Sequence, residues 1–210
     1  DVFNLFQVVM NQKDELEKAC YMMPIHSDLL NYWKNNEEVE PIMKALRFLL
    51  RSNLTFLGAG SVIKHSASQG AGGGKVFKDS FNSKLELTFK SLYDVQFVNF
   101  DFRKFLGKLS FAKDGRNDEA KTFIYNDPPY QNTQDNYSNS FVKQDLIDLI
   151  ETNIKTGCKF AISEFDTDVV LELAAEYNLE VIIIGERKNL KSRRTEILIV
   201  NYKSPALNDL

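Results

Sequence analysis

The chain has 210 residues, which is enough for one large domain or for one domain with a sizeable insertion. Hydrophobic residues make up 43% and charged residues 26%, the ordinary balance of a globular protein. The formal net charge is -3, so bulk charge does not indicate a nucleic-acid binder, and any such surface has to be a local basic patch.

Cysteine and histidine spacing predicts neither a disulfide framework nor a metal site. Cys20 and Cys158 lie far apart in the chain, a usage that fits a reducing cytoplasm. His26 and His65 have no Cys or acidic partner at ligand spacing, so we expect no metal. The apolar stretch at Ala45–Leu57 is interrupted by arginines, and we expect no membrane span and no signal peptide.

The first half of the chain reads as helical. Apolar residues at helical spacing predict a helix at the N-terminus, and the pattern starts in mid-helix, so we expect a further segment upstream. Ser27 is the expected cap of the second helix, and Pro41 occupies a first-turn position of the third. The helices are predicted at Val2–Met10, Ser27–Trp33, Pro41–Leu50 and Ser83–Leu92, with a mobile loop at Gly58–Gly74.

The second half alternates strands with helices, which favours a parallel, doubly wound sheet. The strands are predicted at Val95–Phe100, Thr122–Tyr125, Cys158–Ser163, Leu179–Ile184 and Thr195–Tyr202, and the helices at Phe141–Lys155 and Thr167–Tyr177. Only Gly185–Arg194 joins the last two strands. A parallel crossover needs a dozen or more residues, so this pair is expected to form an antiparallel hairpin.

The motif with the clearest chemistry is Asp127-Pro128-Pro129-Tyr130, which follows the apolar run Phe123–Tyr125 of a predicted strand. Ligands of open parallel sheets bind at the carboxyl ends of strands, so a site is expected here. Two prolines stiffen the turn and remove two backbone donors. What remains is rich in acceptors and suits an amino group, which offers two donors, while Tyr130 supplies an aromatic face for a base.

Asp127–Tyr130 resembles the motif of Dam-type, adenine-specific DNA methyltransferases of bacteria and phages. Further matching segments are Val98–Phe102, Phe160–Ser163, Arg194–Tyr202 and, upstream, Arg47–Asn53 with Phe56 and Gly58. The resemblance implies an α/β fold: a Rossmann-like methyltransferase sheet with a C-terminal antiparallel hairpin and a mostly helical target-recognition insertion. It implies a catalytic core at residues 1–14 and 76–210, with its N-terminal part missing, and a target-recognition region at residues 15–75.

The same resemblance implies methyl transfer from S-adenosylmethionine to the exocyclic amino group of a flipped adenine in double-stranded DNA, leaving S-adenosylhomocysteine. Asp127, Pro128, Pro129 and Tyr130 would be catalytic. Asp101, Phe102 and Asp127 would contact the cofactor, although an Asp after a strand also commonly caps the next helix. The protein is expected to be monomeric and cytoplasmic, with neither metal nor membrane as a partner.

The glycine-rich cofactor loop of such enzymes has no clear counterpart. Phe56–Ser61, with Asp79 as the ribose-binding acid, is one candidate, but no buried strand precedes it, and the loop is expected upstream of Asp1 instead. Gly70–Gly74 is read as a flexible loop. The basic residues of the final hairpin are predicted to contact DNA phosphates: Arg187, Lys188, Lys191, Arg193 and Arg194.

Two rival functions stay open at this point. The chain could be a DNA-binding or interaction protein that has a methyltransferase fold and does not bind S-adenosylmethionine. Alternatively, the enzyme class holds and the acceptor differs: RNA adenine, a cytosine amino group or a protein glutamine. Asp at position 127 favours adenine on family grounds.

Overall fold

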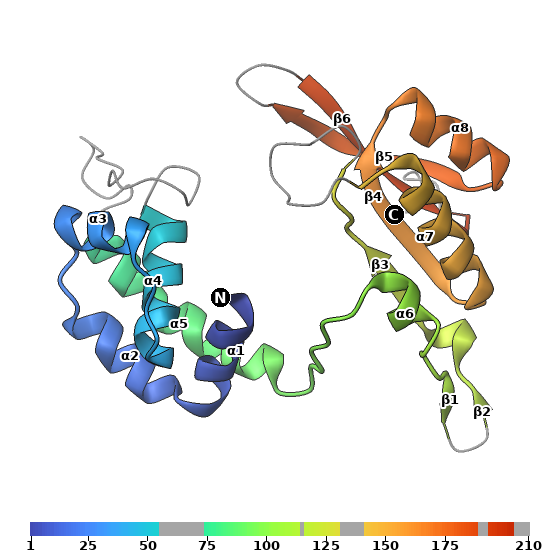
Figure 1. Cartoon of the computed structure of the whole chain (residues 1–210). Coiled ribbons are helices and arrows are strands. Elements are labelled where there is room, and N and C mark those ends of the chain that lie inside the picture. The colour runs from blue at the N-terminus through green and yellow to red at the C-terminus, as the bar shows by residue number, and fades with distance from the viewer. Residues whose placement is uncertain (55–73, 114–115, 131–140, 189–192, 204–210) are drawn as a thin grey trace. The chain divides into compact units, whose positions relative to one another are not determined.

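The computed structural model describes residues 1–54, 74–113, 116–130, 141–188 and 193–203. The chain divides into two compact units, Asp1–Phe97 and Val98–Leu210 (Figure 1). No described helix is long and apolar enough to cross a membrane.

Unit 1 is helical in its described residues. Its apolar positions recur at helical spacing, so each helix buries one stripe and leaves its charged face in water. The helices are α1 (Val2–Asn11), α2 (Lys13–Met22), α3 (Ser27–Asn35), α4 (Pro41–Leu54) and α5 (Gly74–Leu92). The four predicted helices are confirmed, α5 begins earlier than predicted, and α2 was not predicted. The predicted loop at Gly58–Gly74 lies outside the described residues except for Gly74, which begins α5.

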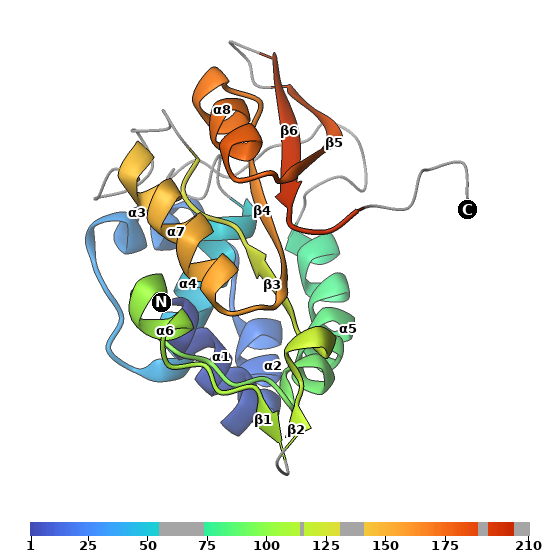
Figure 2. The ribbon, with the colours of Figure 1, turned by 90° about the vertical axis from the view of Figure 1, so that its right-hand side faces the viewer.

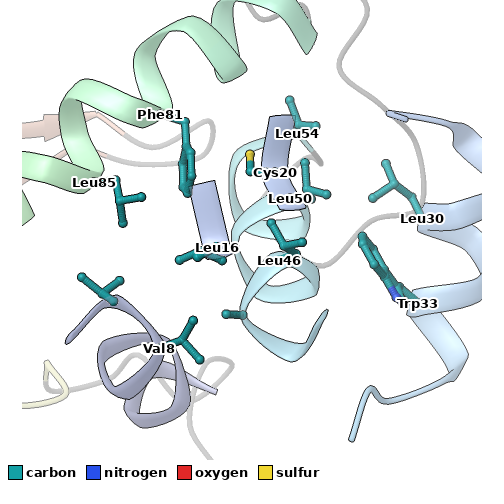
Figure 3. Packing of buried hydrophobic residues seen from close by; sticks show 12 residues of the cluster. Val8, Leu16, Cys20, Leu30, Trp33, Leu46, Leu50, Leu54, Phe81 and Leu85 are labelled. Atoms are coloured by element: carbon teal, nitrogen blue, oxygen red, sulfur yellow. The ribbon is translucent and has the colours of Figure 1, made fainter. Parts of the chain in front are cut away.

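The core of unit 1 forms where α1, α2, α4 and α5 pack together, with Trp33 of α3 inserted beside Leu46 of α4 (Figure 3). Trp33 is fully buried, and its indole Nε1 donates to Glu38 Oε1 at 2.6 Å. Its backbone carbonyl accepts from Nε of the buried Arg47 at 3.1 Å. Hydrogen bonds of this kind offset the desolvation cost of buried polar groups, so the core tolerates them.

Two details of unit 1 concern sequence predictions. The cap of α3 is His26, whose Nδ1 accepts from the Asp28 backbone N–H, so the prediction of Ser27 as the cap is wrong. Helix α1, assigned from sequence to the catalytic core, packs against α2, α4 and α5. The predicted division into a catalytic core (residues 1–14 and 76–210) and a target-recognition region (residues 15–75) is a division by function. The two compact units do not test it, and it stays a prediction.

Unit 2 is a mixed α/β arrangement around a four-stranded sheet with the order β3-β4-β6-β5. Strands β3 and β4 are parallel, whereas β6 runs antiparallel to both β4 and β5, so the predicted C-terminal hairpin is confirmed. A small antiparallel pair, β1 and β2, and a 3-10 turn, η2, precede this sheet. The elements are α6 (Phe102–Leu106), β1 (Ala112–Lys113), β2 (Arg116–Asn117), η2 (Glu119–Lys121), β3 (Phe123–Asn126), α7 (Lys143–Lys155), β4 (Lys159–Phe165), α8 (Asp168–Glu176), β5 (Glu180–Lys188) and β6 (Arg193–Val200).

Strand alternation gives this sheet two different faces. Phe160 and Ile162 of β4 share a core with Ile197 and Ile199 of β6 and with helices α6, α7 and α8. The ribbon of these strands and helices is drawn in Figure 2. The alternate residues of β4, Ala161, Ser163 and Phe165, point to the opposite face of the sheet. Strand β4 is buried along nearly its whole length on both faces, and its buried residues include the polar Ser163 and Glu164.

The predicted strand at Val95–Phe100 is wrong. These residues follow α5 as non-helical chain without strand pairing, and their side chains are exposed, Phe100 by 52%. The mixture of apolar and polar residues along Val95–Phe100 resembles the pattern of a strand, but a strand also needs a hydrogen-bonded neighbour. None pairs with this segment within the part of the chain that the structure describes.

Candidate active site

The sequence motif begins where β3 ends. Asn126 is the last residue of β3, and Asp127 follows it at the carboxyl end of the parallel β3–β4 pair. The Asp127 side chain is exposed, while Pro128, Pro129 and Tyr130 are partly buried. The motif therefore lies at the sheet edge where parallel sheets bind their ligands, as the sequence predicted.

A pair of asparagine amides anchors the first residue of this turn. Asn126 Nδ2 donates to the Ala161 carbonyl at 3.1 Å and to Asn153 Oδ1 at 3.2 Å. Asn153 comes from α7, is fully buried, and donates back to the Leu149 carbonyl of its own helix at 2.8 Å. Because Asn126 is tied to both β4 and α7, the backbone that carries Asp127 starts from a fixed position.

A cavity of about 440 Å³ opens beside the turn. It brings together the residues predicted separately for catalysis and for cofactor contact, with the exception of Tyr130. The lining residues are Asp101, Phe102, Arg103, Asn126, Asp127, Pro128, Pro129, Phe141, Asp145 and Leu149. The rings of Phe102 and Phe141 are 6.5 Å apart between centroids, at 56°. A volume of this size falls in the range of small-molecule sites.

Arg103 organises one wall of the cavity. Its guanidinium donates to Asp145 at 2.6 Å and to Asp148 at 2.8 Å, and so ties α6 to α7. A backbone N–H of Val142 and then Arg103 lower the pKa of Asp145, and Gln144 and then Arg103 lower that of Asp148. Arg103 also lies over the Phe102 ring, 4.3 Å from its centroid, which fixes that aromatic side chain.

Asp101 has a structural role that the sequence allowed for. Its carboxylate accepts from the Arg103 backbone N–H at 3.0 Å and so caps α6. Its second oxygen lies 3.4 Å from the Arg103 guanidinium. The residue is both a helix cap and part of the cavity wall, so the capping role does not exclude contact with a ligand.

The cavity is electrostatically negative. Three carboxylates, those of Asp101, Asp127 and Asp145, and one guanidinium, that of Arg103, line it, which leaves a formal charge of two negative units. Such a site attracts a cationic ligand and repels phosphate.

Tyr130 points to a different set of partners. Its hydroxyl donates to Glu196 Oε1 at 2.6 Å and lies 2.7 Å from Ser163 Oγ. Its ring meets the Phe165 ring edge to face, with centroids 4.6 Å apart and planes at 88°. Burial, followed by the hydrogen bond to Glu196, raises the pKa of Tyr130, so the phenol stays protonated near neutral pH.

The predicted phosphate-contacting residues lie at the far end of the β5–β6 hairpin. The ladder sets Arg187 opposite Arg194 and Lys188 opposite Arg193, whereas Lys191 lies outside the described residues. The Arg194 guanidinium lies over the Phe165 ring, 5.1 Å from its centroid, so the basic end of the hairpin and Tyr130 contact the same aromatic side chain.

Sequence reasoning missed several residues of the site. Arg103 and Phe141 line the cavity without belonging to the motif, and Asn153 supports it from beneath. One signal was available: Asp145 and Asp148 are three apart on a predicted helix and so share a face, which indicates a cationic partner. The partnership of Tyr130 with Glu196 joins residues too distant in sequence for any local pattern to reveal.

Among the residues described, no three His, Cys, Asp or Glu side chains group as they would around a metal ion. The candidate for the cofactor loop, Phe56–Ser61, lies outside the described residues, as does the predicted flexible loop Gly70–Gly74 apart from Gly74, whereas Asp79 is part of α5. No protein-family model matches the chain, and no curated protein matches it either.

Proposed function

We propose that this chain carries the catalytic motif of a Rossmann-like, S-adenosylmethionine-dependent DNA adenine methyltransferase, which transfers a methyl group to the exocyclic amino group of a flipped adenine. The observation that carries the proposal is the cavity beside the β3 turn. It gathers Asp127, Pro128 and Pro129 with Asp101 and Phe102, two segments that are separated in the sequence.

The charge of the cavity supports a cationic methyl donor. S-adenosylmethionine carries a positive sulfonium, which a wall with two surplus carboxylates stabilises. The rings of Phe102 and Phe141 offer apolar surface for an adenine ring. The residues present therefore fit the adenosine and sulfonium portions of such a ligand, which would supply the methyl group.

The turn supports an amino-group acceptor. In this proposal the Asp127 carboxylate accepts one hydrogen of the adenine amino group and the Pro128 carbonyl accepts the other. Both acceptors belong to a stiff turn whose start is anchored through Asn126. Holding the amine in this way aligns its nitrogen with the methyl group, and alignment of this kind supplies much of the rate in a direct transfer.

The basic end of the hairpin supports a polyanionic substrate. Arg187 opposite Arg194, and Lys188 opposite Arg193, are like-charged positions in direct register. Basic residues gathered at one end of a hairpin favour contact with phosphate groups. The cavity proposed to accept the base has a negative lining, whereas the hairpin is basic. This separation suits a nucleic acid whose flipped base leaves the duplex and enters the cavity while its phosphate backbone stays outside the cavity.

The test is methyl transfer to duplex DNA by the complete protein, measured as incorporation of a labelled methyl group. Asp127→Ala should abolish incorporation, while Glu172→Ala, at an exposed position of α8 away from the cavity, should retain it. Full activity of Asp127→Ala would contradict the proposal. Incorporation into RNA but not into DNA would keep the site and change the acceptor.

Calorimetry tests the charge argument separately. Asp127→Asn should weaken the binding of S-adenosylmethionine more than that of S-adenosylhomocysteine, because only the former carries the sulfonium charge. Equal losses for both ligands would mean that the Asp127 carboxylate does not face the sulfonium.

A further inference from the structure

We propose that Ser163 and Glu196 are positioning residues: they grip the Tyr130 hydroxyl and hold its aromatic ring in one orientation, as a fixed platform for a planar base. This inference rests on the proposed function in that the base is the acceptor adenine. The grip itself is a feature of the chain and can be tested without any substrate.

The geometry assigns each hydrogen bond a direction. A phenol has one proton to donate, and the carboxylate of Glu196 can only accept, so the Tyr130 hydroxyl donates to Glu196 at 2.6 Å. The hydroxyl oxygen then accepts from Ser163 Oγ at 2.7 Å. With its donor and an acceptor site both used, the hydroxyl is held from two sides.

The two partners come from neighbouring strands and share one face of the sheet. In the β4–β6 register Phe165 lies opposite Glu196, and Ser163 lies two residues before Phe165 on the same face. Ser163 is 1% exposed and Phe165 4% exposed, so both are fixed by packing. Both residues that hydrogen-bond the Tyr130 hydroxyl therefore belong to the two central strands of the sheet and not to a loop.

Phe165 completes the arrangement from the side. Its edge-to-face contact restricts rotation of the Tyr130 ring, and its other neighbour is the Arg194 guanidinium. The same strand, β6, thus carries Arg194, a predicted phosphate contact, and Glu196, two residues further on. A phosphate that binds Arg194 and a base that stacks on Tyr130 would meet residues held by one rigid strand.

The orienting role has a kinetic signature. Replacing a hydrogen bond to a charged group changes a transition-state free energy enough for about a tenfold loss of rate. Glu196→Ala should lower kcat for methyl transfer by about tenfold and leave KM for S-adenosylmethionine nearly unchanged, because the cavity that holds the donor does not include Glu196. Glu196→Gln keeps an acceptor oxygen and should recover most of the rate.

A double-mutant cycle tests whether Glu196 acts through the hydroxyl. Tyr130→Phe removes the hydroxyl and keeps the ring, so Glu196→Ala should cause no further loss in the Tyr130→Phe background. If the losses of the two single variants multiply in the double variant, Glu196 acts independently of Tyr130 and the proposal is wrong. A loss in Glu196→Gln equal to that in Glu196→Ala would also overturn it.

A spectroscopic readout separates this inference from the proposed function. A partly buried phenol whose hydroxyl makes two hydrogen bonds exchanges its proton slowly, so NMR should show a hydroxyl resonance that is absent in Tyr130→Phe and lost in Glu196→Ala. If the resonance behaves in this way but the protein transfers no methyl group, the grip stands and the proposed function fails. If methyl transfer occurs but the resonance is missing in the wild type or persists in Glu196→Ala, the grip fails and the proposed function stands.

Discussion

The amide pair beneath the catalytic turn allows a prediction of definite size. Asn153 is 0% exposed, and it both accepts from Asn126 and donates to the Leu149 carbonyl. Asn153→Ala deprives the Asn126 amide of a partner and leaves a small cavity. A buried polar group that loses its partner costs about 1–3 kcal/mol, and the cavity adds to this, so we expect unfolding to become easier by about 2 kcal/mol.

The loss should appear as a fall of about 8 °C in the melting temperature of unit 2, followed by far-ultraviolet circular dichroism. Lys155→Ala, at an exposed position of the same helix, is the matched control and should change stability by less than about 0.5 kcal/mol. Trp33 fluorescence reports on unit 1 and gives an internal reference. A variant as stable as the control would refute the assignment of an anchoring role to Asn153.

Three other predictions follow from contacts in the two units. Arg103→Ala should destabilise unit 2 by about 1 kcal/mol, since its ion pairs are partly exposed and screened, and should weaken S-adenosylmethionine binding in calorimetry by loosening Phe102. The pKa of the Asp145 carboxyl lies below its ordinary value of 3.8. The ionised carboxylate therefore stabilises the folded state fully above that pH, and this stabilisation is lost as the pH falls below it. The difference in melting temperature between the wild type and Asp145→Asn should be largest near about pH 6 and should shrink below about pH 4. Trp33→Ala should cost unit 1 about 3–5 kcal/mol in urea unfolding, and a loss below about 1 kcal/mol would contradict its place in the core.

Much of unit 2 could be predicted because its elements are long and strongly patterned. The apolar residues Phe160–Ile162 of β4 and the helical spacing of α7 each identify their element without tertiary information. The short segment between β5 and β6 was enough to predict a hairpin, since chain length alone excludes a crossover. The motif at Asp127 was located correctly because its neighbours identify the end of a strand.

The failures have a common physical origin. The pattern at Val95–Phe100 shows only which side chains are apolar. Whether the segment pairs as a strand depends on a second strand, which the local sequence does not specify. Helix α6 is too short for an apolar period and depends on its Asp101 cap and on Arg103. The Tyr130–Glu196 contact requires knowledge of the register between β4 and β6, which only the folded sheet provides.

The position of β6 has a consequence for how the chain comes to be folded. It lies between β4 and β5 although it follows both of them in sequence. While the chain is being synthesised, β5 therefore has no strand to join until β6 has emerged, and one edge of β4 stays open for the same period. Open edges of apolar strands are the surfaces on which nascent chains associate. Emergence of β6 from the ribosome should thus be the step that closes the described sheet and brings Glu196 to Tyr130, so a protein truncated before Arg193 would lose both together.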